Sequence, residues 1–99
     1  MALTFDDGPG RVTAPVLEVL AGHGVHATFN VLGERVADHT ALLRRLVGEG
    51  HEVGNHAFHH ERLAGRPLEA LRQMTRTNAV VSRAAGVGPR VFRAPYGSV

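Results

Sequence analysis

The chain has 99 residues, of which 43% are hydrophobic and 20% charged, and its formal net charge is +2 at pH 7. This length allows one small domain, and no apolar stretch reaches the roughly 18 residues that a membrane span requires. The absence of cysteine excludes disulfides and thiolate metal sites, and the scattered arginines do not form the concentrated basic face of a nucleic-acid-binding protein.

Short apolar runs predict four β-strands, separated by helical patterns. The strands are expected at residues 2–5, 27–32, 51–55 and 90–93. The third run is shorter and more polar than the first two. Alternation of strands and helices is typical of a parallel sheet with helical crossovers, so an α/β fold is expected.

Three helices are predicted between these strands. The first should begin at Thr13, whose hydroxyl can cap it, with Pro15 in its first turn. The second should begin at Asp38 or Thr40, and the third and longest at Pro67. The apolar face of the long helix is expected to contain Leu71, Met74, Val81 and Ala85.

Three Gly-x-Gly elements each follow a predicted helix and precede a predicted strand. They are Gly22-His23-Gly24, Gly48-Glu49-Gly50 and Gly86-Val87-Gly88. Glycine readily adopts the left-handed conformation that ends a helix, so these elements are interpreted as helix-to-strand loops. They are not phosphate-binding loops, because none follows a strand and opens a helix.

The polar motifs of the chain lie at the ends of predicted strands. Asp6 and Asp7 follow the first strand, Asn30 lies toward the end of the second, His56 follows the third, and residues 93–97 follow the fourth. In parallel α/β proteins, chemistry gathers at the carboxyl ends of the strands. We therefore expect these residues to converge on a single active site.

Adjacent carboxylates at Asp6 and Asp7 repel each other unless a positive charge lies nearby, and a metal ion would supply it. His56 and His60 offer two imidazoles four residues apart. One carboxylate and two histidines form a metal triad with open positions, which leaves the other carboxylate free to act as a base. His59 is a further candidate ligand.

Other interpretations of the same residues remain open at this point. Asp6 and Asp7 precede Gly8-Pro9 and could form only a turn. Arg93 could form a plain salt bridge, and Tyr96 could pack in the core. The remaining histidines are expected at the surface, away from the strand ends: His23, His26, His39 and His51.

Three segments together resemble a known family. Thr4-Phe5-Asp6-Asp7-Gly8, Gly54-Asn55-His56-x-x-x-His60 and Phe92-Arg93-Ala94-Pro95-Tyr96-Gly97 are similar to the first three motifs of the polysaccharide deacetylases. These enzymes form carbohydrate esterase family 4 and share their domain with nodulation (NodB-type) chitooligosaccharide deacetylases. The resemblance covers residues 2–97, and the ordered spacing of three motifs makes it specific.

The resemblance implies a partial (β/α) barrel, with about four parallel strands and crossover helices forming half of a distorted TIM-like deacetylase barrel. The family has two later motifs, one containing a Trp and one containing the histidine that acts as general acid. Neither motif is present, and the chain has no Trp. Residues 1–99 are therefore expected to be the N-terminal part of a catalytic domain.

The resemblance also implies a set of metal ligands and a catalytic base. Asp7, His56 and His60 would bind a divalent ion, with Zn²⁺ expected and Co²⁺ or Ni²⁺ able to substitute. Asp6 would be the general base, and Arg93 would hold it ionised and correctly aimed.

Residues of the third motif would contact the substrate. The backbone N–H of Tyr96 would stabilise the oxyanion, while Pro95 and the Tyr96 ring would line the substrate groove. The implied reaction is the hydrolysis of N- or O-acetyl groups on a glycan such as peptidoglycan, a chitin oligomer or acetylxylan. This fragment alone would have weak activity or none, and the uncovered edges of a half-barrel would favour self-association.

Two positions depart from the family pattern. Ala57 replaces the Ser or Thr that usually follows the first histidine, and losing that hydroxyl should cost about 10–100-fold in metal affinity or activity. Asn30 replaces an aromatic residue and is either a substrate contact or a tolerated change.

Two alternative functions remain: a non-catalytic metal- or glycan-binding module, and a C–N hydrolase of the wider superfamily that acts on small cyclic amides. The cellular compartment stays undetermined, although full-length family members are often secreted or associated with the cell envelope.

Overall fold

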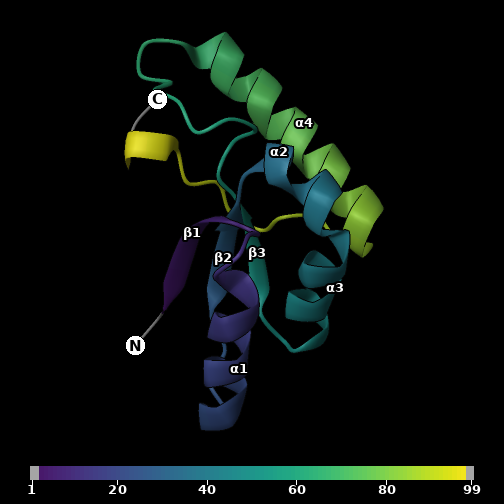
Figure 1. Cartoon of the computed structure of the whole chain (residues 1–99). Coiled ribbons are helices and arrows are strands. Elements are labelled where there is room, and N and C mark those ends of the chain that lie inside the picture. The colour runs from purple at the N-terminus through teal and green to yellow at the C-terminus, as the bar shows by residue number, and fades with distance from the viewer. Residues whose placement is uncertain (1–2, 98–99) are drawn as a thin grey trace.

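The computed structural model describes residues 3–97, in which three parallel strands form one sheet (Figure 1). The strands are β1 (Thr4–Gly8), β2 (Thr28–Val31) and β3 (Glu52–Asn55), in the spatial order β1-β2-β3. The predicted parallel α/β fold is confirmed. The first predicted strand was placed at residues 2–5, and Ala2 lies outside the described residues.

Helices connect consecutive strands and follow the last one. They are α1 (Thr13–His23), α2 (Gly33–Val36), α3 (Thr40–Gly48) and α4 (Pro67–Ala85), with short 3-10 turns η1 (Ala37–His39) and η2 (Pro95–Gly97). The predicted starts at Thr40 and Pro67 are confirmed. Thr13 begins α1 but does not cap its own helix in the predicted way; its Oγ1 accepts a hydrogen bond from the Gly10 N–H instead.

The hydrophobic core lies between one face of the sheet and these helices. Phe29, Val31 and Val53 of the sheet pack in the same cluster as Leu17 of α1 and Leu43 of α3. Side chains alternate between the two faces of a strand, so Asp6, Asn30 and Gly54 belong to the opposite face. The helices thus cover the apolar face of the sheet, and the opposite face carries polar residues.

The fourth predicted strand is reduced in the structure to an isolated parallel bridge between Asn55 and Phe92. Residues 90–93 do run beside β3, since Arg90 N–H donates to Val53 O and Arg93 N–H donates to Asn55 O. The segment is short and lies between two prolines, at 89 and 95, which cannot donate to a ladder. The predicted strand was therefore wrong in extent but right in position.

The predicted apolar face of α4 is confirmed in part, since Val81 is buried and Ala85 packs against the core. Its buried residues are Ala70, Gln73, Thr77 and Val81, whereas Leu71 is largely exposed. The apolar pattern did not indicate Gln73, which is buried because α4 lies over a loop whose backbone N–H groups require a polar partner.

His51 is buried rather than at the surface as predicted. Its Nδ1 accepts a hydrogen bond from the Ala27 N–H. Burial, followed by the neighbouring His26, lowers the pKa of His51, which favours the neutral ring that this hydrogen bond requires.

The Gly-x-Gly elements end helices as predicted. Gly24 and Gly86 are the left-handed C-caps of α1 and α4, and Gly50 also has a positive φ. Within residues 3–97, no helix has the length and apolar character needed to cross a membrane.

Candidate active site

A β-bulge brings both adjacent carboxylates to the same site. In the β1–β2 register Asp6 is opposite Asn30 and Gly8 is opposite Val31, so Asp7 is an extra residue in β1. Its φ of 77° lies in the left-handed region, which aspartate tolerates better than most residues. A regular strand would send Asp6 and Asp7 to opposite faces, and a bulge re-aims one of them.

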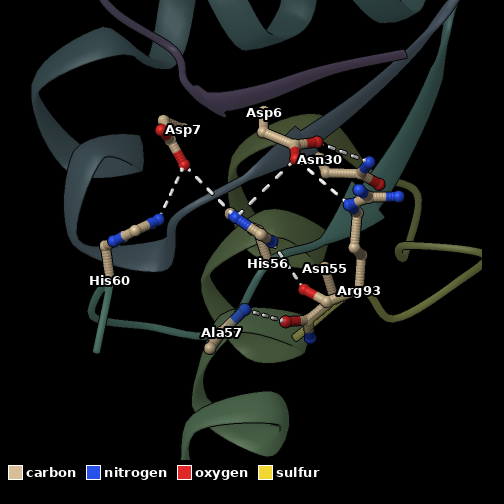
Figure 2. Close-up of polar contacts among 8 residues, drawn as sticks. All are labelled: Asp6, Asp7, Asn30, Asn55, His56, Ala57, His60 and Arg93. Carbon is tan, nitrogen blue, oxygen red and sulfur yellow. Dashed lines mark hydrogen bonds and ion pairs between the residues drawn. The ribbon is translucent and has the colours of Figure 1, made fainter. Parts of the chain in front are cut away.

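Asp7, His56 and His60 converge at the carboxyl ends of β1 and β3 (Figure 2). Asp7 Oδ1 lies 3.2 Å from His56 Nε2 and 3.4 Å from His60 Nε2. The three donor atoms all lie within 4.8 Å of one another. His56 is buried, whereas Asp7 and His60 are exposed, so the cluster opens to one side.

The donor set fits a divalent metal ion. Two ligands about 2.1 Å from a tetrahedral Zn²⁺ stand about 3.4 Å apart, which matches both distances to Asp7. The contact of His56 Nδ1 with the carbonyl oxygen of Arg93 requires an N–H on Nδ1, since a carbonyl only accepts. That tautomer leaves the lone pair of Nε2 directed at Asp7, as a metal-binding histidine requires.

Asp6 lies beside this cluster with both oxygens engaged (Figure 2). Its Oδ1 accepts a hydrogen bond of 2.9 Å from Asn30 Nδ2. Its Oδ2 lies 3.1 Å from Arg93 Nε and 4.0 Å from His56 Nε2. The predicted pairing of Asp6 with Arg93 is thus present in the geometry, and Asp6 is held without being one of the three clustered ligands.

The loop between the two histidines is held by amides that the sequence pattern did not reveal. Asn55 Oδ1 accepts a hydrogen bond from the Ala57 N–H. Buried Gln73 of α4 accepts hydrogen bonds from the N–H groups of Phe58 and His59 through its Oε1. An inward polar residue on an otherwise amphipathic helix was the only available signal for Gln73.

His59 lies outside the carboxylate–histidine cluster. Its Nδ1 lies 2.9 Å from Glu34 Oε2, and it does not belong to the group formed by Asp7, His56 and His60. The geometry therefore favours the ligand set that includes His60 over the alternative with His59.

The third motif lies next to His60. The Tyr96 ring packs edge-on against His60 with 4.9 Å between ring centroids, and the Arg62 guanidinium lies 4.6 Å from the Tyr96 centroid. Tyr96 is exposed, whereas Pro95 is fully buried. Of the two residues predicted to line the groove, the Tyr96 ring is thus the one at the surface.

A cavity of about 340 Å³ opens beside the two carboxylates, between β1, β2 and α1. Phe5, Phe29 and Val16 form its apolar wall, and Arg11 and Arg35 also line it. Of the three clustered residues Asp7, His56 and His60, Asp7 is the one that borders this cavity.

The fold and the site together define an α/β protein with a carboxylate–histidine cluster at the carboxyl ends of parallel strands. This chain belongs to the polysaccharide deacetylase family, whose model matches residues 1–99.

Individual relatives agree with this assignment. The chain is 40% identical to a peptidoglycan-N-acetylglucosamine deacetylase of Bacillus cereus over 101 residues, covering 100% of this chain and 37% of the relative. It is 47% identical to a chitooligosaccharide deacetylase of Bradyrhizobium sp. over 98 residues, covering 96% of this chain and 45% of the relative. The chain thus spans less than half the length of these two relatives.

A solved structure also matches. The family 4 acetyl xylan esterase from Clostridium thermocellum, in complex with a cobalt ion, superposes with a TM-score of 0.93 at 42% identity, over 99% of this chain and 49% of the other. The expected half of a deacetylase barrel is therefore confirmed.

Proposed function

We propose that this chain is the N-terminal part of the catalytic domain of a metal-dependent carbohydrate deacetylase. The enzyme would hydrolyse N- or O-acetyl groups on a carbohydrate polymer. The observation that carries this proposal is the position of Asp6, held on both oxygens beside the cluster of Asp7, His56 and His60. The relatives named as peptidoglycan and chitooligosaccharide deacetylases support the same reaction class.

Asp7, His56 and His60 would hold the ion, with Zn²⁺ as the expected metal and Co²⁺ or Ni²⁺ as substitutes. When bound, the ion would lower the pKa of a water molecule and polarise the acetyl carbonyl. The cobalt ion in the acetyl xylan esterase structure is consistent with a metal in such a site.

Asp6 would act as the general base. It would accept a proton from the water that attacks the acetyl carbon. Arg93 would orient Asp6, since its Nε contacts Oδ2. The C–N or C–O bond of the acetyl group then breaks, releasing acetate and an amine or a hydroxyl on the sugar. By the family resemblance, the acid that protonates the leaving amine lies outside these 99 residues.

The third motif would bind the reacting group. The Tyr96 backbone N–H would donate a hydrogen bond to the oxyanion that forms as water adds. The exposed Tyr96 ring, with Pro95 buried behind it, would form one wall of the groove for the glycan. Acetylated peptidoglycan, chitin oligomers and acetylxylan are the candidate substrates.

Acetate release by the intact protein in which this chain occurs would test the proposal. The Zn²⁺-loaded protein should release acetate from N-acetylglucosamine oligomers or acetylxylan, and a chelator should stop it. The Asp6→Asn variant should lose about 10²–10⁴-fold in turnover, as is typical when a general base is removed, while still binding Zn²⁺.

Two other outcomes would overturn this function. Tight Zn²⁺ binding with no acetate release from any acetylated glycan would indicate a non-catalytic binding module. Hydrolysis of small cyclic amides, with acetylated glycans left intact, would place the protein in the C–N hydrolase branch instead.

A further inference from the structure

Three neighbouring strands place Asp6, Asn30 and Gly54 in one row across the sheet. Asp6 is in register with Asn30, and Asn30 is in register with Gly54. All three belong to the face opposite the hydrophobic core. Asn30 is thus the residue of β2 that the sheet places directly against the proposed base.

The chemistry of the contact fixes which end of the Asn30 amide meets Asp6. An ionised carboxylate only accepts hydrogen bonds, so the NH₂ group must face it, as in the 2.9 Å contact from Nδ2 to Oδ1. This contact occupies one oxygen of Asp6. It leaves Oδ2 as the oxygen 4.0 Å from His56 Nε2, on the side of the metal cluster.

Asn30 is the more rigid of the two groups that hold Asp6. Its side chain rotates about two bonds, and only 3% of the residue is exposed. The side chain of Arg93 is longer and 60% exposed, so it has more conformational freedom to lose when it orders. The orientation of the carboxylate is therefore set mainly from the Asn30 side.

The surroundings of Asn30 are arranged for this amide. A Cβ at Gly54 would collide with Asn30 Oδ1, so glycine leaves the space that the amide fills. Among residues 3–97, Asn30 Oδ1 has no hydrogen-bond partner. Burying an unpaired polar atom is unfavourable, and an apolar side chain of similar size would avoid it. The hydrogen bond to Asp6 is what the amide provides and an apolar residue would not.

We propose that Asn30 is a positioning residue that fixes the carboxylate of Asp6 so that Oδ2 faces the reacting water. This inference rests on the proposed function, since it gives Asp6 the role of base. Asn30 would act through Asp6, since its side chain hydrogen-bonds to Asp6 and to none of Asp7, His56 and His60 in the described structure. Its loss should therefore lower turnover and leave metal affinity unchanged.

The Asn30→Leu variant of the intact protein tests this role, because leucine has the same branching at Cγ and removes the donor. The turnover number should fall about 10–100-fold, as is typical for residues that orient a catalytic group, with KM and Zn²⁺ affinity unchanged. Thr28→Val is the matched control, since Thr28 lies two residues earlier on the same face of β2, and it should retain full turnover.

A double-mutant cycle separates positioning from space filling. In the Asp6→Asn background, Asn30→Leu should cause no further loss of turnover, because there is no base left to position. The proposal would be overturned if the two losses of turnover multiplied in the double variant. It would also be overturned if Asn30→Leu lowered the Zn²⁺ affinity in parallel with the turnover. Wild-type protein that releases no acetate would overturn the proposed function itself, whereas an Asn30→Leu variant with full turnover would overturn only the role of Asn30.

A direct measurement covers the case in which Asn30→Leu fails to fold. The side-chain amide protons of Asn30, observed by NMR in the wild-type protein, should be shifted downfield and protected from exchange. In the Asp6→Ala variant, which has no side-chain acceptor at position 6, the Asn30 amide proton that donates to Asp6 Oδ1 should lose this shift. Amide signals that are the same in both proteins would contradict the contact on which the proposal depends.

Discussion

Histidines 59 and 60 are adjacent in sequence but make different contacts, which allows a sharp test of the ligand set. His60 Nε2 lies 3.4 Å from Asp7 Oδ1, whereas His59 Nδ1 lies 2.9 Å from Glu34 Oε2. The sequence left His59 open as a ligand, because spacing alone does not say which way each ring points.

His60→Ala should weaken Zn²⁺ binding by more than about 100-fold, because losing a ligand should exceed the about 10–100-fold typical of residues that only orient ligands. His59→Ala is the matched control and should bind Zn²⁺ as the wild type does. It removes an exposed contact with Glu34, of a kind worth about 0–1 kcal/mol, and an edge-on packing contact with Phe58. Calorimetric titration of both variants makes the comparison, and equal losses would show that His60 is wrongly assigned.

Sequence motifs placed several polar groups at the ends of strands, and the structure brings them together as expected. Asp7 lies 3.2 Å from His56, and Asp6 lies 3.1 Å from Arg93. The bulge at Asp7 could not be predicted, because it depends on how β1 pairs with β2. The Asn30 contact with Asp6 depends on the same register.

At the scale of elements, α4 braces the loop that presents the two histidines. Gln73 reaches from the helix to the backbone N–H groups of Phe58 and His59. Its own NH₂ group donates to Glu61 and Glu69. The apolar pattern of α4 did not predict Gln73 as a buried residue. The loop N–H groups need a polar acceptor, and a pattern of apolar residues does not indicate one.

Gln73→Leu should destabilise the protein by about 1–3 kcal/mol for each buried N–H that loses its acceptor. Zn²⁺ affinity should fall about 10–100-fold, since the histidine loop is held less firmly. Urea unfolding and Zn²⁺ titration measure the two effects. Thr75→Ala, an exposed change on the same helix, should leave both unchanged. If Gln73→Leu matched the wild type in both measurements, Asn55 alone would be sufficient to hold the loop.

The hydrogen bonds that hold the histidine loop affect the loss of metal affinity or activity that is expected from Ala57. The family hydroxyl at this position is absent, but the Ala57 N–H is bonded to Asn55 Oδ1 and the next two N–H groups are bonded to Gln73. The predicted loss from Ala57 stays a prediction, and these amides are the groups that would limit it.

At the scale of the whole molecule, the described helices cover one face of a three-stranded sheet (Figure 1). β1 pairs only with β2 among the described residues, so its other edge has no partner there. The order of elements followed from alternating apolar runs and helical patterns. The extent of the fourth strand could not be predicted in this way, because the segment between Pro89 and Pro95 is short and proline cannot donate to a ladder.

Self-association of the 99-residue chain is the prediction that belongs to this scale. Unpaired strand edges and exposed apolar side chains, such as Val91 at 53% exposure, favour contacts between copies. In sedimentation velocity experiments, the isolated chain should form larger species as its concentration rises, whereas the intact protein should not. The isolated chain should also release acetate weakly or not at all.

Val91→Lys tests whether this region causes the self-association, because a charge beside the outer edge of the sheet opposes pairing with another chain. It should shift the isolated chain toward monomer. Val87→Lys is the control, since Val87 is similarly exposed but follows α4, away from the bridge between Asn55 and Phe92. A wild-type chain that is monomeric, unfolds cooperatively and releases acetate as fast as the intact protein would show that these residues form a complete enzyme, because a half-barrel lacking its acid could not do so.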